Sequence, residues 1–271
     1  MYLERAKEIL ENEYHLQREK NVVKHYLDVM DEKIKHSYQV LGVGNYLLKH
    51  EDCFKNYSAE DKDFFQAVVL LHDLGRFYEI LRAGEGERVD HCVYGSQMLS
   101  EIEEFNSVEA VLAVRYHGCL IEELYKDERY KSLSNEEQER VEKLTFLVRD
   151  ADKLANFYLL MSDFEEMEPL FYVPKSFENP YVKTVSDVIA EEFFTHKSVN
   201  RKYVTNFAEW TLQYLSWVFD LNYKYSFVFL QKLNILSKLE DFWTKHFYEE
   251  DREKFYTCLN EYMAEKLKMM K

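Results

Sequence analysis

The sequence predicts an all-α protein. Apolar residues recur at helical intervals along most of the chain, and the alternating apolar and polar runs that indicate strands are nearly absent. Hydrophobic residues make up 46% of the 271 residues, with only seven glycines and three prolines. This composition excludes collagen-like, low-complexity and intrinsically disordered chains, and it leaves enough apolar material for a core.

Helical periodicity predicts the individual elements in the first part of the chain. His36, Val40, Val43 and Leu47 follow the i, i+4, i+7, i+11 pattern of one helix face. The segment Ser58-Ala-Glu-Asp has the form of a capped start for a helix that runs to Leu71. Three further helices are expected, from near His91 through Ile102, from Ser107 to His117, and from Asn135 to about Met161.

A cluster of prolines predicts a boundary. The segment MEPLFYVPKSFENP contains Pro169, Pro174 and Pro180. Proline breaks helices and biases the preceding residue toward extended geometry. We therefore expect two domains, residues 1–166 and residues 167–271, joined near residue 166.

The second region is rich in aromatic residues. Five of them are spaced by four, three, four and three residues, which places them on one helical face: Tyr203, Phe207, Trp210, Tyr214 and Trp217. We predict that this face is core. The alternative is a surface for substrate stacking or for a partner helix, through which an oligomer could form.

Charge and targeting signals restrict the partners. The formal net charge of −15 repels nucleic-acid polymers and anionic lipid surfaces, so an anionic substrate needs a metal or a few local basic side chains. The charged N-terminus has no secretion signal, and charges interrupt the apolar stretch from Trp210 to Leu236, so we expect a cytoplasmic protein without a membrane span. The scattered Cys53, Cys92, Cys119 and Cys258 are interpreted as packing residues.

Several metal-ligating residue types lie on apolar helix faces. They are, in chain order, His36, His72, Asp73, His91, His117 and Asp152. Burying carboxylates and imidazoles without partners costs several kcal/mol, whereas a shared cation satisfies them together. The mixed imidazole and carboxylate donors suit Mn, Fe, Co, Ni or Zn better than Ca or Mg. The sequence therefore predicts a divalent transition-metal site with one or two ions.

The order His, His-Asp, Asp resembles the signature of the HD-domain metal-dependent phosphohydrolase superfamily. The local segments VVLLHDLGRFYE, DHCVYGSQML, RYHG and LVRDADKLAN carry this resemblance, which is nearest to uncharacterised bacterial HD-domain proteins. It implies that residues 1–166 hold a catalytic helical bundle. It does not extend to the C-terminal region.

The resemblance also implies roles for the ligands. His36, His72, Asp73 and Asp152 would hold one metal, Asp73 would bridge to a second, and His91 and His117 would complete the second site. Asp150 and Asp152 are about 200° apart on a regular helix, so both cannot face one ion. We choose Asp152, and Asp150 would orient a histidine or form a salt bridge.

These residues imply hydrolysis of a small phosphate ester, such as a nucleotide, by attack of a metal-bound hydroxide. Asp73, His91, His117 and Arg76 form the predicted catalytic set, and either histidine could be a general acid if it is not a ligand. Arg76 and, with a weaker claim, Lys153 are the predicted phosphate-binding residues. The alternative for Arg76 is a surface pairing with Glu79.

Two other functions use the same residues. Some HD-fold proteins hold two irons with four histidines and two aspartates and activate dioxygen, as in inositol oxygenase-like enzymes. A ligand-sensing regulatory module is the other alternative. The ligand types do not separate these functions, although Arg76 favours hydrolysis.

Overall fold

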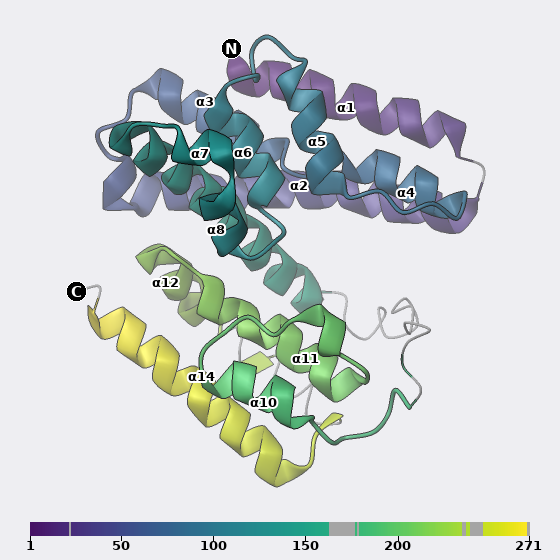
Figure 1. The fold of residues 1–271 in the computed structure, drawn as a ribbon, viewed down its shortest axis with the longest axis vertical. Helices are drawn as coiled ribbons and strands as arrows, with labels where there is room; N and C mark the ends of the chain where they lie inside the picture. The colour runs from purple at the N-terminus through teal and green to yellow at the C-terminus, as the bar shows by residue number, and fades with distance from the viewer. Residues whose placement is uncertain (22, 163–176, 178, 235–236, 239–245, 270–271) are drawn as a thin grey trace. The chain divides into compact units, whose positions relative to one another are not determined.

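The computed structural model describes residues 1–21, 23–162, 177, 179–234, 237–238 and 246–269 (Figure 1). All regular structure within these ranges is helical, which confirms the all-α prediction. The chain divides into two compact units, Met1–Ala155 and Asn156–Lys271. The division falls within the helix Asn135–Ser162, whereas the predicted boundary near residue 166 lies outside the described residues.

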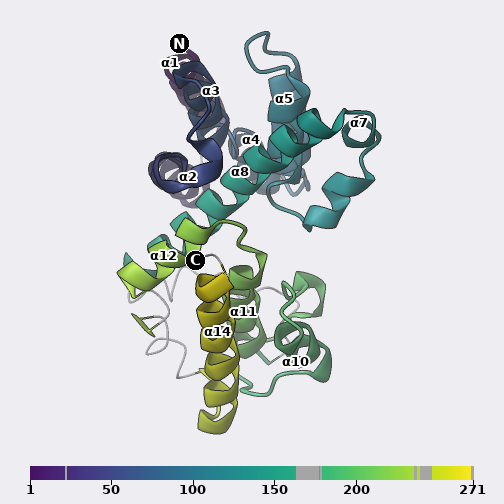
Figure 2. The ribbon, with the colours of Figure 1, turned by 90° about the vertical axis from the view of Figure 1, so that its left-hand side faces the viewer.

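The first unit is a helical bundle that carries every candidate site residue. Its elements are α1 (Tyr2–Lys20), α2 (Lys24–His50), η1 (Asp52–Phe54), α3 (Ala59–Leu70), α4 (Arg76–Gly84), α5 (His91–Ser100), α6 (Val108–Tyr116), η2 (Ile121–Lys126), α7 (Glu128–Lys131) and the first part of α8 (Asn135–Ser162). Helix α1 packs against α3 and α4, and α5 packs against α6. Figures 1 and 2 both show α1 and α3 side by side.

Side-chain caps set where the helices of this unit begin. The Ser58 hydroxyl accepts from the Asp61 backbone N–H at 3.0 Å, and the Asp61 carboxylate accepts from the Ser58 N–H, which forms the predicted capping box of α3. The Asp90 carboxylate accepts from the first backbone N–H groups of α5, and Ser107 caps α6. These caps place His91 on the first turn of α5 and His117 at the end of α6.

The turn before α4 and the helix α5 approach each other backbone to backbone. A Cβ atom on Gly75 would lie 2.4 Å from the His91 carbonyl oxygen and 2.6 Å from the Gly95 nitrogen. No side chain fits at that distance, so glycine is required at position 75. The contact holds the turn that contains Asp73 against the start of α5.

The second unit is also helical in its described residues. Its main elements are α10 (Asp187–Phe194), η3 (Arg201–Tyr203), α11 (Phe207–Leu215), η4 (Ser216–Asp220), α12 (Lys224–Leu233) and α14 (Glu249–Met269). Helix α10 packs against α11 and α14, and α12 packs against α14. None of the helices in the described part of the chain is both long enough and apolar enough to cross a membrane.

The prediction that the aromatic stripe is core was wrong. Tyr203 is 37% exposed and lies in η3, which is separated from α11 by non-helical residues. Phe207, Trp210, Tyr214 and Trp217 are only half-buried, and they form a ladder of ring contacts. The buried apolar residues of α11 are Ala208, Leu212 and Leu215. The core face of α11 is therefore the face with these smaller side chains, and the aromatic ladder lies beside it.

Candidate metal centre

Three donors from distant parts of the first unit form one group. His36 lies on α2, His72 follows α3 in a turn, and Asp152 lies on α8. The His36 Nε2 atom is 2.9 Å from Asp152 Oδ1, and His72 Nε2 is 3.6 Å from the same oxygen. One ligand atom from each residue lies within 4.8 Å of the other two, so the three could hold an ion together.

A second set of donors surrounds Asp73. Its Oδ1 atom lies 3.4 Å from His91 Nε2 and 3.6 Å from His117 Nε2, while its Oδ2 atom lies 3.8 Å from His72 Nε2. Asp73 therefore lies between the first group and the two later histidines, at the place where a shared carboxylate would be. The structure brings all six predicted ligands into one region.

The two aspartates near the end of the first unit have different surroundings. Asp152 is partly exposed and faces His36 and His72, whereas Asp150 is fully buried and belongs to none of the donor groups found among the described residues. This arrangement follows from the 200° separation of the two positions on a regular helix.

Backbone carbonyls fix the orientation of two imidazoles. His72 Nδ1 is 2.9 Å from the Val69 carbonyl oxygen, and His117 Nδ1 is 2.7 Å from the Val114 carbonyl oxygen. Because a carbonyl only accepts hydrogen bonds, each Nδ1 carries the proton and donates it. Each Nε2 lone pair is then directed toward Asp73 or Asp152, which is the arrangement of a metal-ligating histidine.

Two cationic side chains border Asp73 and reach solvent. Arg76 Nη2 is 3.4 Å from Asp73 Oδ1 and 2.7 Å from His91 Nε2, and the guanidinium also pairs with Glu79. The pairing with Glu79 that sequence reasoning offered as an alternative is present, but it lies beside the donors. Lys33 Nζ is 3.7 Å from Asp73 Oδ2. Lys153, the weaker predicted phosphate-binding residue, is buried on α8 next to Asp152.

Sequence reasoning missed Lys33 in this region and the positions of Glu79 and Cys92 beside the histidines. Lys33 lies three residues before His36, which places it on the same face of α2, and this spacing was an available signal. Glu79 faces His91 Nδ1 at 3.4 Å in addition to pairing with Arg76. The interpretation of Cys92 as a packing residue was incomplete, because its Sγ atom lies 3.3 Å from His91 Nε2 and 3.9 Å from His117 Nε2.

The charges of the donors are strongly coupled. Burial raises the pKa of Asp73, but Arg76 and His72 outweigh burial and hold this pKa well below its usual value. Burial likewise opposes ionisation of Asp152, yet His36 and His72 keep its pKa well below the ordinary range.

Burial lowers the pKa of His117, but Cys92 and Asp73 raise it well above its usual value. Burial raises the pKa of the Cys92 thiol, but the neighbouring His117 and His91 lower it by more, so that this pKa falls to about 6. The carboxylates thus remain ionised and attract positive charge.

The donors fit a divalent transition metal. His72 Nε2 and Asp73 Oδ1 are buried and have no hydrogen-bond partner among the described residues. Buried polar atoms without partners are rare in native proteins and call for an explanation such as an ion. Imidazole and carboxylate donors match Mn, Fe, Co, Ni and Zn. His36, His72, Asp73 and Asp152 could hold one ion, and Asp73, His91 and His117 could hold a second.

A buried arginine supports the end of α6. The Arg149 side chain is 1% exposed, and its Nη1 atom donates to the carbonyl oxygens of Tyr116 at 2.7 Å and His117 at 3.1 Å, and also to that of Cys119. These carbonyls have no partner within α6, because the helix has ended. Arg149 therefore positions the backbone that carries His117.

The comparisons with known proteins agree with this geometry. Residues 34–156 match the family model of the HD domain. No curated protein and no solved structure matches the chain. The matched segment begins just before His36, ends just after Asp152 and contains all six donors. For residues 34–156, this match confirms the predicted resemblance to the HD domain.

Proposed function

We propose that the protein is a metal-dependent phosphohydrolase that acts on a small phosphate ester, with nucleotides as the favoured substrate class. The observation that carries this proposal is the meeting of six metal-type donors and two solvent-reaching cations at Asp73. A bound divalent ion would polarise phosphoryl oxygens and make hydroxide available near neutral pH.

The donors and the cations have different exposures, which suggests separate tasks. His72, His117 and Asp73 are almost completely buried, whereas the side chains of Arg76 and Lys33 are 25% and 28% exposed. A phosphate that enters from solvent would therefore meet the guanidinium and the ammonium beside the donors. The Arg76 fork can donate two parallel hydrogen bonds to phosphoryl oxygens, and Lys33 adds a point charge.

These two cations also supply the positive charge that an anionic substrate needs on this acidic protein. A net charge of −15 disfavours anionic ligands over most of the surface. A phosphate ester consequently binds only where positive charge is concentrated. Arg76 and Lys33 supply that charge from two different helices on either side of Asp73.

His91 has the surroundings of a proton donor if it is not needed as a ligand. Its Nδ1 atom faces the Glu79 carboxylate at 3.4 Å, and its ring is less buried than those of His72 and His117. The carboxylate would stabilise an imidazolium that protonates the leaving oxygen of the ester. Glu79 is then a positioning residue for His91.

Metal analysis and a phosphatase screen test the proposal. Full-length protein is assayed for bound metals and for hydrolysis of nucleotides and generic phosphate esters under anaerobic conditions, together with His72→Ala and Asp73→Asn. His25→Gln, an exposed histidine on α2, is the matched control. We expect the two site variants to lose metal and activity while the control keeps both. Oxygen consumption by a di-iron protein that does not cleave any ester would instead support the oxygenase alternative and overturn the proposal.

A further inference from the structure

We propose that Cys92 is a metal ligand, and that His91, Cys92 and His117 form a sulfur-containing position for a soft divalent ion such as Zn²⁺. This inference rests on the proposed metal centre but concerns a donor that the imidazole and carboxylate set does not include. It would make the second metal position chemically different from the first.

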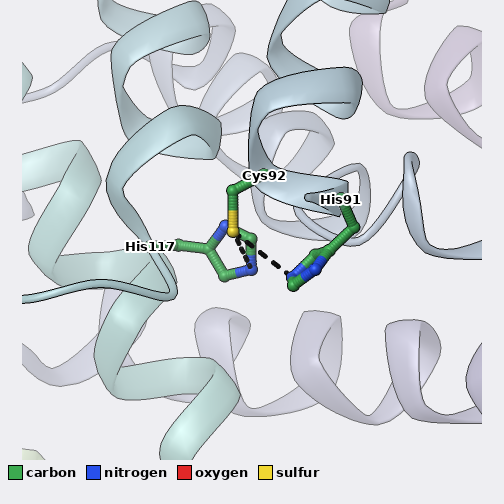
Figure 3. Close-up of side chains that lie close together, drawn as sticks. All are labelled: His91, Cys92 and His117. Carbon is green, nitrogen blue, oxygen red and sulfur yellow. Dashed lines mark hydrogen bonds between the residues drawn. The ribbon is translucent and has the colours of Figure 1, made fainter. Parts of the chain in front are cut away.

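The geometry brings the sulfur to the donor atoms of both histidines. Cys92 is 6% exposed, and Figure 3 shows its sulfur directed toward the His91 and His117 rings. Its Sγ atom is 3.3 Å from His91 Nε2 and 3.9 Å from His117 Nε2. Sulfur and nitrogen ligands of one tetrahedral zinc lie about 3.5 Å apart, as zinc–ligand bond lengths of about 2.3 and 2.0 Å require. The two observed distances lie on either side of this value.

A fourth donor lies beside the same nitrogens. Asp73 Oδ1 is 3.4 Å from His91 Nε2 and 3.6 Å from His117 Nε2, and within the described residues this buried oxygen has no hydrogen-bond partner. The donor group that contains the sulfur is His91, Cys92 and His117, and Asp73 borders both of its imidazole nitrogens.

Local structure holds the thiol in place. Cys92 is the second residue of α5, and its backbone N–H donates to the Asp90 side chain at 2.9 Å. Against the sulfur lies Gly118, at which a Cβ atom would come within 3.0 Å of Sγ. The side chain is thus confined between α5 and the residues after α6.

A simple hydrogen bond explains the position of the thiol less well. The sulfur faces the Nε2 atoms of two imidazoles, and its single S–H proton can be donated to only one of them. Cys53, Cys119 and Cys258 also differ from Cys92. None of these three belongs to a metal-type donor group in the described part of the chain.

The inference predicts two positions with different metal preferences. His36, His72 and Asp152 offer only nitrogen and oxygen, whereas the position at Cys92 adds sulfur. Thiolates select zinc and similar soft ions over magnesium and manganese. We therefore expect the second position to retain Zn²⁺ or Co²⁺ when the first is exchanged for Mn²⁺.

Cobalt spectroscopy tests the ligand directly. The metal-free full chain is titrated with Co²⁺ and its near-ultraviolet absorption is recorded for the wild type, Cys92→Ser and Cys92→Ala, with Cys119→Ser as the matched control. We expect a thiolate-to-cobalt charge-transfer band in the wild type and the control, and no band in either Cys92 variant. The affinity for Zn²⁺ should fall by at least the roughly 10-fold to 100-fold that removal of an outer-shell partner costs.

The outcomes distinguish this inference from the proposed function. A wild-type spectrum without the band, or a band that persists in Cys92→Ser, overturns the assignment of Cys92 even if ester hydrolysis is intact. A band that is lost only with Cys92 supports the assignment even if no ester is cleaved. Thermal unfolding of each variant shows whether it is folded. If the Cys92 variants are not folded, a band in both the wild type and Cys119→Ser supports the assignment, because Cys92 is the one cysteine of the described residues in a donor group, and absence of the band overturns it.

Discussion

The two donor groups are built from different parts of helices. In the first group, His36 and Asp152 lie on interior turns of long helices, α2 and α8, and His72 lies in the turn after α3. His91, Cys92 and His117 lie at the start of α5 and at the end of α6. The comparison teaches that interior donors are specified by periodicity alone, whereas terminal donors depend on caps and on contacts between neighbouring backbones.

The groups also differ in chemistry. The first contains imidazole and carboxylate donors, while the second adjoins a thiol and a guanidinium. Asp73 is the one side chain within hydrogen-bond or ion-pair range of both His72 and His117 in the described structure. Variants that affect one group and spare the other therefore test whether the two groups hold separate ions.

The largest expected effect comes from Asp73→Asn, because this variant removes the carboxylate between the groups. We expect loss of both metal positions and a fall in ester hydrolysis of more than about 100-fold, since even outer-shell substitutions cost up to that factor. Metal content and initial rates measure the effect. Retention of both metals would show that Asp73 is not shared.

Chelation should produce the next largest effect. Metal binding stabilises the folded state by about 2.7 kcal/mol when the free ion is at 100 times its dissociation constant. For a protein of this size each kcal/mol corresponds to about 2–4 °C in melting temperature. We expect a chelator to remove this stabilisation from the wild type, so that its melting temperature falls by nearly three times the change per kcal/mol. The melting temperature of Asp73→Asn should fall by much less. Equal shifts in the two proteins would contradict metal linkage at this site.

Arg149→Met should weaken the second group selectively. The arginine donates to the carbonyls of Tyr116 and His117, so its removal frees the backbone that carries His117. We expect the affinity of the second ion to fall by about 10-fold to 100-fold, as for other supporting residues, with little change at the first group. Competitive metal titration measures this loss, and Arg149→Lys should recover part of it. Equal weakening of both ions would indicate a general structural role.

The smallest effect concerns acid stability near α6. The Asp127 carboxylate accepts from Arg129 and from the Tyr116 hydroxyl, and these bonds lower its pKa well below the usual value. A pKa that is lowered in the folded state stabilises the protein at pH values above 3.8, the pKa of the unfolded carboxyl group. This stabilisation is lost as the pH falls through the pKa of the folded state. Asp127→Asn should therefore be less stable than the wild type at pH 7.

Denaturant unfolding at several pH values checks this prediction. The difference between the wild type and Asp127→Asn should narrow below about pH 4, where the unfolded carboxyl group is already protonated. Asp28→Asn, on an exposed position of α2, is the control. A difference that stays constant with pH would show that the charge of Asp127 does not matter.

The sequence predicted most of the first unit and the gathering of its ligands. Helix α3 with its Ser58 cap and the long α8 could be predicted because caps and periodicity act locally. Helix geometry allows only one of Asp150 and Asp152 to face an ion, and the resemblance of Ala151-Asp152-Lys153-Leu154 to the family's segment favours Asp152. The match of residues 34–156 to the HD-domain model agrees with the predicted set of ligands.

The rest could not be predicted because it depends on packing between elements. The cysteines are scattered without a CxxC pair, which predicts packing residues, and periodicity does not specify where the Cys92 side chain points on the first turn of a helix. Its position depends on the Asp90 cap and on the space beside Gly118. The core prediction for the aromatic stripe of the second unit was wrong for a related reason. Periodicity places Phe207, Trp210 and Tyr214 on one face of α11, but packing against other elements decides which face is buried.

The close approach at Gly75 acts as a spacer of constant size for the metal centre. Main-chain atoms of the Asp73 turn and of α5 are in direct contact there, so their van der Waals radii determine the separation. Bond rotations within side chains cannot change that separation. Ions of different radius must then be accommodated by the imidazoles and the carboxylate alone, and an engineer who wishes to widen the centre must start from the glycine.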